Sequence, residues 1–154
     1  WYNADPVRGS QEIEEEVEHV AEKSGVISDT PGLLTLRIGT VIEKMKYDIS
    51  EFSAKPNQKV KLIFANPDFM PHNLVFTNPE KADEVAQQAL ILGAKGFDVA
   101  FVPDSTDVLF STQLLDHGKE EVLTFTVPST TGDYPYVCTF PGHHILMRGV
   151  MKVK

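Results

Sequence analysis

Residues 134–151 read YPYVCTFPGHHILMRGVM. The first part, Tyr134–Cys138, is typical of a β-strand, and Gly149–Met151 is typical of the start of a final strand. Between these segments, Pro141 and Gly142 predict a turn. We therefore expect a β-sandwich in which two strands hold both ends of a short loop, with the cysteine delivered to one end of the sandwich.

The loop carries side chains that bind soft metal ions. Cys138 is the only cysteine, His143 follows five residues later, and Met147 follows four residues after that. Far upstream, His72 and Asn73 offer a second imidazole beside an amide. Two histidines and one cysteine in a trigonal arrangement, with a weak axial methionine, are the ligands of a blue-copper electron-transfer site. The pattern therefore predicts that these residues bind one copper ion.

Taken singly, these residues have ordinary explanations. A lone buried cysteine is usually a small hydrophobic residue, and an isolated methionine in a β protein usually belongs to the core. Single histidines such as His19 and His117 are typical of a surface, and we assign them no role. The combination is what favours a metal site. Zinc accepts similar ligands, so the sequence leaves the identity of the metal open.

Apolar and polar residues alternate along much of the chain. The alternating segments are 34–39, 59–64, 74–76, 123–127 and 151–153. A period of two with polar partners indicates sheets that have one face in water. Short strands separated by Pro, Gly, Asn and Asp are typical of a Greek-key sandwich. We therefore predict an all-β fold of this architecture.

One segment breaks the alternation. Asn78 and Pro79 predict the cap and first turn of a helix, and Gly93 predicts its end. The apolar residues between them share one helical face: Ala82, Val85, Ala86 and Ala89. We expect a helix of about three turns, inserted between strands as a flap that packs on the sandwich.

The first 24 residues hold seven acidic and two basic side chains, so they carry five of the eight net negative charges. Ser10 is a favourable cap for an amphipathic helix that Gly25 would end, and Asp29–Gly32 predicts a turn. We therefore predict an acidic helical extension or linker over residues 1–30 and the β domain over residues 31–154. The extension is either a solvated lead-in helix or a contact with a neighbouring domain of a longer protein.

Composition excludes several classes of protein. The 154 residues suffice for one domain with a hydrophobic core, and 42% of them are hydrophobic. No apolar run reaches the roughly 20 residues of a transmembrane helix. No basic stripe is present, so we expect no nucleic-acid partner. The chain begins at Trp1 without a signal peptide, and we expect a processed protein or an excised domain.

The run Cys138–His143, followed by Leu146, Met147 and a final strand, resembles the azurin and auracyanin branch of the cupredoxins. The resemblance extends from about Thr35 to Lys154 and includes the helical flap. Members of this family are small β-sandwich proteins that shuttle one electron through a type 1 copper ion. The resemblance implies equatorial ligation by Nδ1 of His72, the Cys138 thiolate and Nδ1 of His143. Met147 would be the long axial ligand.

The same resemblance implies roles around the ligands. The backbone N–H groups of Asn73 and Phe140 would bond the cysteine sulfur, and the Asn73 side chain would join the two ligand segments through Thr139. Such bonds withdraw charge from the thiolate and raise the reduction potential. Asn73 would otherwise be a turn residue.

The chain departs from azurins at three points. Pro71 replaces the glycine before the first histidine, as in the Pro-His-Asn segment of plastocyanin. The sequence therefore leaves undecided whether the Pro71 carbonyl makes a fifth, axial contact with the copper ion. His144 stands where azurins have a small residue; it is either a proton-sensitive group near the electron port or a solvated neighbour. The azurin disulfide is absent because there is no second cysteine.

Other copper proteins fit the sequence less well. Val137 and Thr139 flank Cys138, so the histidine relay of multicopper oxidases and nitrite reductases is missing, and we predict an electron carrier, not an enzyme. A binuclear purple centre needs two cysteines. A copper storage or chaperone module remains the alternative, although the other methionines, Met45, Met70 and Met151, are scattered.

The electron-carrier reading implies a docking surface. We expect an apolar patch where the His143 imidazole edge reaches solvent; its other members are Met70, Pro71, Phe140, Pro141, Ile145 and Leu146. Redox partners such as a cytochrome, dehydrogenase or oxidase would dock there weakly. The resemblance implies a periplasmic or otherwise extracytoplasmic location. The acidic extension favours a partner with some positive surface and a tether to a larger redox protein.

Overall fold

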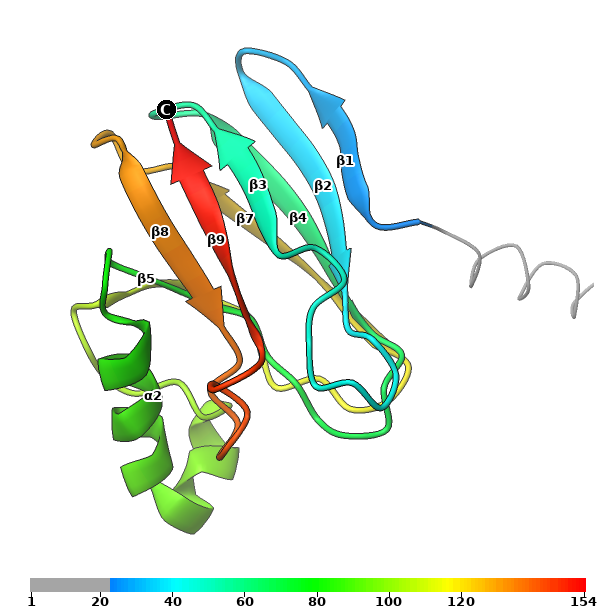
Figure 1. The fold of residues 1–154 in the computed structure, drawn as a ribbon, viewed down its shortest axis with the longest axis vertical. Coiled ribbons are helices and arrows are strands. Elements are labelled where there is room, and N and C mark those ends of the chain that lie inside the picture. Colours follow the sequence, from blue (N-terminus) through cyan, green and yellow to red (C-terminus); the bar gives the residue numbers. More distant parts are fainter. Residues whose placement is uncertain (1–22) are drawn as a thin grey trace, which may run out of the picture.

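The computed structural model describes residues 23–154, in which two β-sheets pack face to face (Figure 1). One sheet has the order β1 (Gly25–Asp29), β2 (Leu33–Gly39), β4 (Lys59–Asn66), β7 (Lys119–Thr126). The other has the order β3 (Glu51–Ala54), β9 (Arg148–Val153), β8 (Gly132–Val137), β5 (Val75–Thr77), β6 (Val108–Ser111). The pairs β2–β4 and β3–β9 are parallel and the other pairs are antiparallel. The predicted β-sandwich is confirmed.

Alternation along the strands places every second side chain in the core between the sheets. In β2 and β4, Leu36 lies opposite Leu62, and both side chains are fully buried. From the second sheet, Phe76, Tyr136 and Met151 enter the same core, also fully buried. Burying such side chains contributes roughly 1.5–3 kcal/mol each. This core fixes the strands from which the loops at the lower end of Figure 1 extend.

Strand β1 lies before the predicted start of the β domain. Gly25 opens β1, which pairs antiparallel with β2 through contacts such as Val26 with Leu36. The sheet therefore begins six residues earlier than the predicted boundary at residue 31. The predicted N-terminal helix falls on residues outside the described part, so the division into an extension and a β domain stays a prediction.

The helical insertion is present between β5 and β6, but it begins later than predicted. Helix α2 (Ala82–Ile91) has Lys81 as its cap residue, without a side-chain cap bond. The predicted cap at Asn78 is wrong because its side chain donates instead to Asp107 (3.1 Å), and Glu80 has a left-handed φ of 65° that interrupts any helix starting there. Gly93, at φ 56°, ends α2 as predicted.

A second helical segment follows α2. The 3₁₀ helix η1 (Gly93–Val99), which the sequence did not predict, leads to Ala100 and Phe101, both with a φ of 56°. Helix α2 buries Ala82 and Val85 against Val75 of β5 and Val137 of β8 (Figure 1). The insertion therefore packs beside the strand that leads to Cys138. No helix within residues 23–154 has the length and apolarity needed to cross a lipid bilayer.

Candidate metal centre

The segment between β8 and β9 is a tight loop closed by its own backbone. The N–H of Cys138 donates to the carbonyl of Met147 (3.0 Å), and the N–H of Met147 donates to the carbonyl of His143 (2.9 Å). The N–H of His143 in turn donates to the carbonyl of Phe140 (3.0 Å). Gly142 has a φ of 84°, a left-handed conformation that favours glycine at this turn. The loop therefore holds the cysteine, histidine and methionine in fixed relative positions.

His72 reaches the same place from the segment between β4 and β5. Its backbone pairs with that of Leu115: the N–H of His72 donates to the carbonyl of Leu115 (N to O, 3.1 Å), and the N–H of Leu115 donates to the carbonyl of His72 (2.8 Å). Leu115 lies between β6 and β7, so the bridge ties the segment of His72 to the connection between those two strands. The histidine is thus positioned by backbone bonds on the segment that carries it.

The sulfur and two ring nitrogens converge. Cys138 Sγ lies 3.8 Å from His72 Nδ1 and 3.6 Å from His143 Nδ1. The three ligand atoms all lie within 4.8 Å of one another, and all three residues are buried. Within residues 23–154, this is the one group of three or more His, Cys, Asp or Glu side chains that could hold a metal ion.

The two sulfur–nitrogen separations fit a trigonal metal ion. With a metal–sulfur distance of about 2.3 Å, a metal–nitrogen distance of about 2.0 Å and angles of about 120°, sulfur and nitrogen would lie about 3.7 Å apart. The observed values of 3.6 and 3.8 Å bracket this separation. A thiolate and two imidazoles are also the donors that copper favours. The cluster is therefore able to bind one copper ion.

Burial shapes the protonation of the site without an ion. Burial raises the pKa of the Cys138 thiol to about 11, although the backbone N–H groups of Asn73 and Phe140 lower it in part. Burial also lowers the pKa of His143 to about 4; repulsion from His72 adds to this effect and Asp68 opposes it. At neutral pH the thiol is protonated and His143 is neutral. A metal ion that binds here therefore replaces the thiol proton.

Asn73 joins three segments around the site. Its Oδ1 accepts the N–H of Thr139 (2.9 Å), and its Nδ2 donates to Thr139 Oγ1 (2.8 Å) and to the carbonyl of Ala100 (2.8 Å). Thr139 Oγ1 then donates to the carbonyl of Phe101 (2.6 Å). One fully paired network thus joins Asn73, Thr139 and the two residues that follow η1.

The remaining predicted residues lie close by. Met147 is fully buried in the same hydrophobic cluster as Cys138. The Phe140 ring lies 4.8 Å from the His143 ring, measured between centroids. Pro71 is half-buried directly before His72. The axial roles of the Met147 sulfur and of the Pro71 carbonyl stay predictions.

The sequence analysis missed two residues that bond residues of the site. Asp68 is buried, and its Oδ2 lies 2.7 Å from His72 Nε2. The Tyr47 hydroxyl donates to the carbonyl of Asn73 (2.7 Å). Burial is the main reason that the pKa of Tyr47 lies well above its usual value. Asp68 stands only four residues before His72, but spacing within a loop does not show which side chains face each other. Tyr47 lies in a segment without periodicity.

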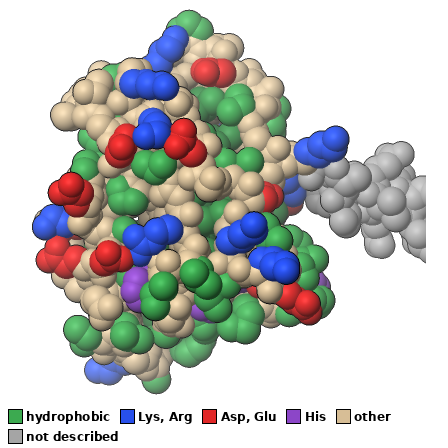
Figure 2. Space-filling view, in the orientation of Figure 1, with side chains coloured by type: hydrophobic (Ala, Val, Ile, Leu, Met, Phe, Trp, Pro, Cys, Tyr) green, Lys and Arg blue, Asp and Glu red, His purple; other side chains and the backbone are tan. Residues whose placement is uncertain are grey.

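Hydrophobic side chains gather on the surface over this end of the sandwich (Figure 2). Ile145 and Leu146 of the ligand loop are 70% and 66% exposed, and Met70 is 45% exposed. His143 itself is only 2% exposed. The expectation that its imidazole edge reaches solvent is therefore wrong in degree, because the side chain is almost fully buried, with the Phe140 ring against it. His144 is half-buried, and its carbonyl accepts from Arg148 (2.8 Å).

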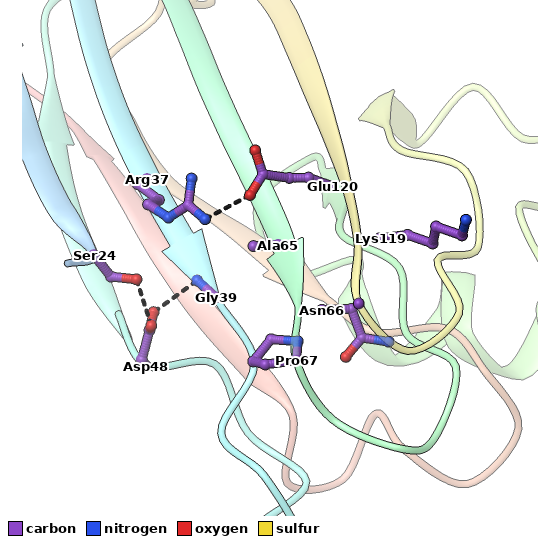
Figure 3. A pocket seen from close by; sticks show the side chains of 10 residues that line it. Ser24, Arg37, Gly39, Asp48, Ala65, Asn66, Pro67, Lys119 and Glu120 are labelled. Atoms are coloured by element: carbon purple, nitrogen blue, oxygen red, sulfur yellow. Dashed lines mark hydrogen bonds and ion pairs between the residues drawn. The ribbon is translucent and has the colours of Figure 1, made fainter. Parts of the chain in front are cut away.

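Away from the ligand cluster, a hollow lies between the ends of β2, β4 and β7 (Figure 3). Arg37 pairs there with Glu120 (2.6 Å), and Asp48 accepts the N–H of Gly39 (2.8 Å) and the hydroxyl of Ser24. None of the converging ligand residues lines this hollow. It is therefore separate from the metal centre.

Comparison with known proteins gives concordant matches. Residues 34–154 match the sequence model of copper binding proteins of the plastocyanin/azurin family. Auracyanin-B of Chloroflexus aurantiacus is 31% identical over 135 residues, covering 84% of this chain and 56% of that protein. Auracyanin-A of the same organism is 30% identical over 126 residues, covering 79% of this chain and 75% of that protein. The chain thus spans just over half of the first relative and three quarters of the second.

Solved structures agree. The structure of reduced auracyanin from the photosynthetic bacterium Roseiflexus castenholzii aligns with a TM-score of 0.71 at 29% identity, covering 82% of this chain and 99% of that one. The structure of auracyanin A, described as a "blue" copper protein, aligns with a TM-score of 0.72 at 28% identity, covering 80% of this chain and 100% of that one.

Proposed function

The chain belongs to the plastocyanin/azurin family of copper-binding proteins, and from this premise we propose that it is an electron carrier that moves one electron at a time. The observation that carries the proposal is the convergence of Cys138 Sγ with the Nδ1 atoms of His72 and His143 at 3.8 and 3.6 Å. One thiolate and two imidazoles at this spacing are typical of a type 1 copper site.

In this proposal His72, Cys138 and His143 are the equatorial ligands, and Met147 supplies a weak axial sulfur. A bound copper ion supplies a one-electron couple between Cu(II) and Cu(I). The N–H groups of Asn73 and Phe140 that point at the sulfur withdraw charge from the thiolate. They therefore raise the reduction potential.

The surrounding residues support fast electron transfer by keeping the ligands still. The backbone bonds of the ligand loop fix Cys138, His143 and Met147 relative to one another. The Asn73 side chain fixes the loop to the segment that carries His72 through its two bonds with Thr139. Burial of all three converging residues keeps water away from the ligands. A site held in this way changes its geometry little between oxidation states, so the reorganisation energy is low.

The apolar surface over the ligand loop is the proposed docking site for redox partners. Ile145 and Leu146 are highly exposed there, on the same loop as the buried His143 ring, which Phe140 flanks. Small apolar contacts of this kind suit weak and transient encounters. The partner would be a cytochrome, a dehydrogenase or an oxidase, and the protein would work in an extracytoplasmic compartment, as its resemblance to auracyanins and azurins suggests.

A copper storage or chaperone role is the alternative, and the described methionines argue against it. Met147 and Met151 are fully buried and Met45 is half-buried, so Met70, at 45% exposed, is the one exposed methionine among the described residues. An exposed methionine cluster, as storage proteins use, is not formed within residues 23–154.

A redox titration tests the proposal. The protein is loaded with Cu(II), and its visible absorption is followed during stepwise reduction and reoxidation. We expect one copper per chain, an intense blue colour and a reversible loss of colour that fits a one-electron couple. Binding of several copper ions, or copper that cannot be cycled, would favour storage instead.

A further inference from the structure

The second nitrogen of His72 faces a buried carboxylate. Asp68 Oδ2 lies 2.7 Å from His72 Nε2, and the side chains are 4% and 1% exposed, respectively. The other ligand histidine differs, because no ion pair within residues 23–154 involves His143. The two imidazoles of the site are therefore held by different chemistry.

The position of Asp68 is built into the loop that carries it. Its Oδ1 accepts the N–H of Glu43 (2.9 Å), and its own N–H donates to Asn66 Oδ1 (3.1 Å). The Asn66 amide donates in turn to the carbonyls of Met70 (2.9 Å) and Leu115 (2.8 Å). The carbonyl of Leu115 also accepts the N–H of His72. The carboxylate and the imidazole are thus fixed to the same frame.

This contact decides which ring nitrogen of His72 can bind a metal. A carboxylate accepts hydrogen bonds, so Nε2 is the nitrogen that carries the proton. Nδ1 then presents its lone pair, and Nδ1 is the atom that lies 3.8 Å from Cys138 Sγ. A carboxylate bound to the outer nitrogen of a ligand imidazole also makes the ring a stronger electron donor. A stronger donor favours the more highly charged oxidation state of a bound metal.

We propose that Asp68 is a positioning residue that holds His72 in the tautomer that binds metal through Nδ1 and lowers the reduction potential of the site. This inference rests on the proposed copper site. It adds an opposing influence to the N–H groups at the sulfur, which raise the potential. The potential of this protein is then set by a balance between Asp68 on one ligand and the two N–H donors on another.

The test compares Asp68→Asn with Glu43→Gln. Both variants remove one negative charge from the same small pocket beside His72, but only Asp68 bonds the imidazole. We expect Asp68→Asn to weaken Cu(II) binding by about 10- to 100-fold while changing Cu(I) binding less. The reduction potential then rises by about 59 mV for each tenfold difference between the two. Glu43→Gln should leave the potential nearly unchanged. An unchanged potential in Asp68→Asn, or an equal shift in both variants, would overturn the proposal.

The His72 tautomer gives a second measurement that needs no variant and no metal. Two-bond ¹H–¹⁵N correlations of metal-free wild-type protein show which ring nitrogen is protonated. We expect a proton on Nε2 of His72, and an unprotonated Nε2 would overturn the proposal even if Asp68→Asn fails to fold. If the copper-loaded wild-type protein is not blue, the proposed function fails. The tautomer measured without metal still decides whether Asp68 orients His72.

Discussion

At the scale of the residue, Cys138 combines burial with chemistry. Its side chain is fully buried, yet two backbone N–H groups point at its sulfur and two imidazole nitrogens lie within 3.8 Å. A cysteine that served only as a hydrophobic residue would not need such neighbours. The surroundings instead favour a thiolate that forms when a metal ion takes the place of the proton.

The thiol proton predicts how metal affinity depends on pH. Because the pKa of Cys138 is about 11, binding at neutral pH releases one proton, and affinity should rise about tenfold per pH unit. Below the His143 pKa of about 4, a second proton must leave and the slope becomes steeper. Zinc is a redox-inert probe for this measurement, in competition with a chelator of known protonation.

The control is Cys138→Ser, which has no thiol proton to release when the metal binds. Its affinity should be lower and should depend less on pH. A wild-type affinity that stays constant between about pH 6 and about pH 9 would contradict a thiol that is protonated in the metal-free site.

Asn73 predicts a large effect on stability. Asn73→Ala removes the bonds to Thr139 and Ala100 and leaves their buried polar atoms unpaired. The free energy of unfolding of the metal-free protein should fall by about 3 kcal/mol, measured by urea denaturation. Asn78→Ala is the control, since that side chain makes one half-buried bond, and its loss should cost about 1 kcal/mol. Equal losses would show that the network around Asn73 is unimportant.

The residues that bring the chemistry were visible in the sequence, whereas some of those that contact and orient them were not. Cysteine and histidine are informative as residue types, so their pattern led directly to the converging cluster, whereas the axial role of Met147 stays a prediction. Asp68 and Tyr47 act through contacts between loops, and nothing local in the sequence determines such contacts. The resemblance to cupredoxins supplied Asn73, Thr139 and Phe140.

At the scale of the element, β8 and β9 present the ligand loop, and their pairing depends on one close approach. Gly149 lies against the ring of Tyr136, and a Cβ at this position would come within 2.3 Å of the ring. The ring cannot move away easily, because it is fully buried against Tyr47, Phe52 and Phe76. Glycine is therefore required between the ligand loop and the rest of β9.

Gly149→Ala should lower the free energy of unfolding by about 1–3 kcal/mol, because the added methyl overfills a packed region. Gly32→Ala is a matched control, since a Cβ there would meet nothing within 4 Å. Urea denaturation of both variants gives the comparison. If the two substitutions cost the same, the close approach is not a constraint.

Strands were predictable where one face is clearly buried. Strand β4 alternates between buried and more exposed residues along its length, as does the first half of β2, and their sequences showed this period. Strand β6 is half-buried throughout and β1 is largely exposed, so neither has a clear period. The predicted start of α2 was wrong because Asn78 bonds Asp107 across the loop, and local helix propensity does not describe such a contact.

At the scale of the whole molecule, the metal centre and a group of exposed apolar side chains that includes Met70, Ile145 and Leu146 share one end of the sandwich (Figure 2). The chain carries a net charge of −8, so two copies repel each other at long range. Contact through an uncharged surface reduces this cost at the point of closest approach. Electron exchange between two copies therefore probes the surface without a known partner.

Ile145→Glu should slow electron self-exchange at least about tenfold, because each encounter would bring two new negative charges together at the patch. The reduction potential should not change. Val122→Glu adds the same charge at a 52% exposed position on β7 and should have a much smaller effect. Exchange rates measured by NMR line broadening in mixtures of the two oxidation states give the result. Equal slowing by both variants would place the contact elsewhere.

The optical and EPR spectra of Cu(II)-loaded protein, compared with those of Cys138→Ser, show whether one sulfur and two imidazoles bind a single copper ion. We expect an intense blue band and a type 1 EPR signal in the wild type, and neither in the variant. A colourless wild-type copper complex, or a variant that keeps the blue band, would contradict the claim.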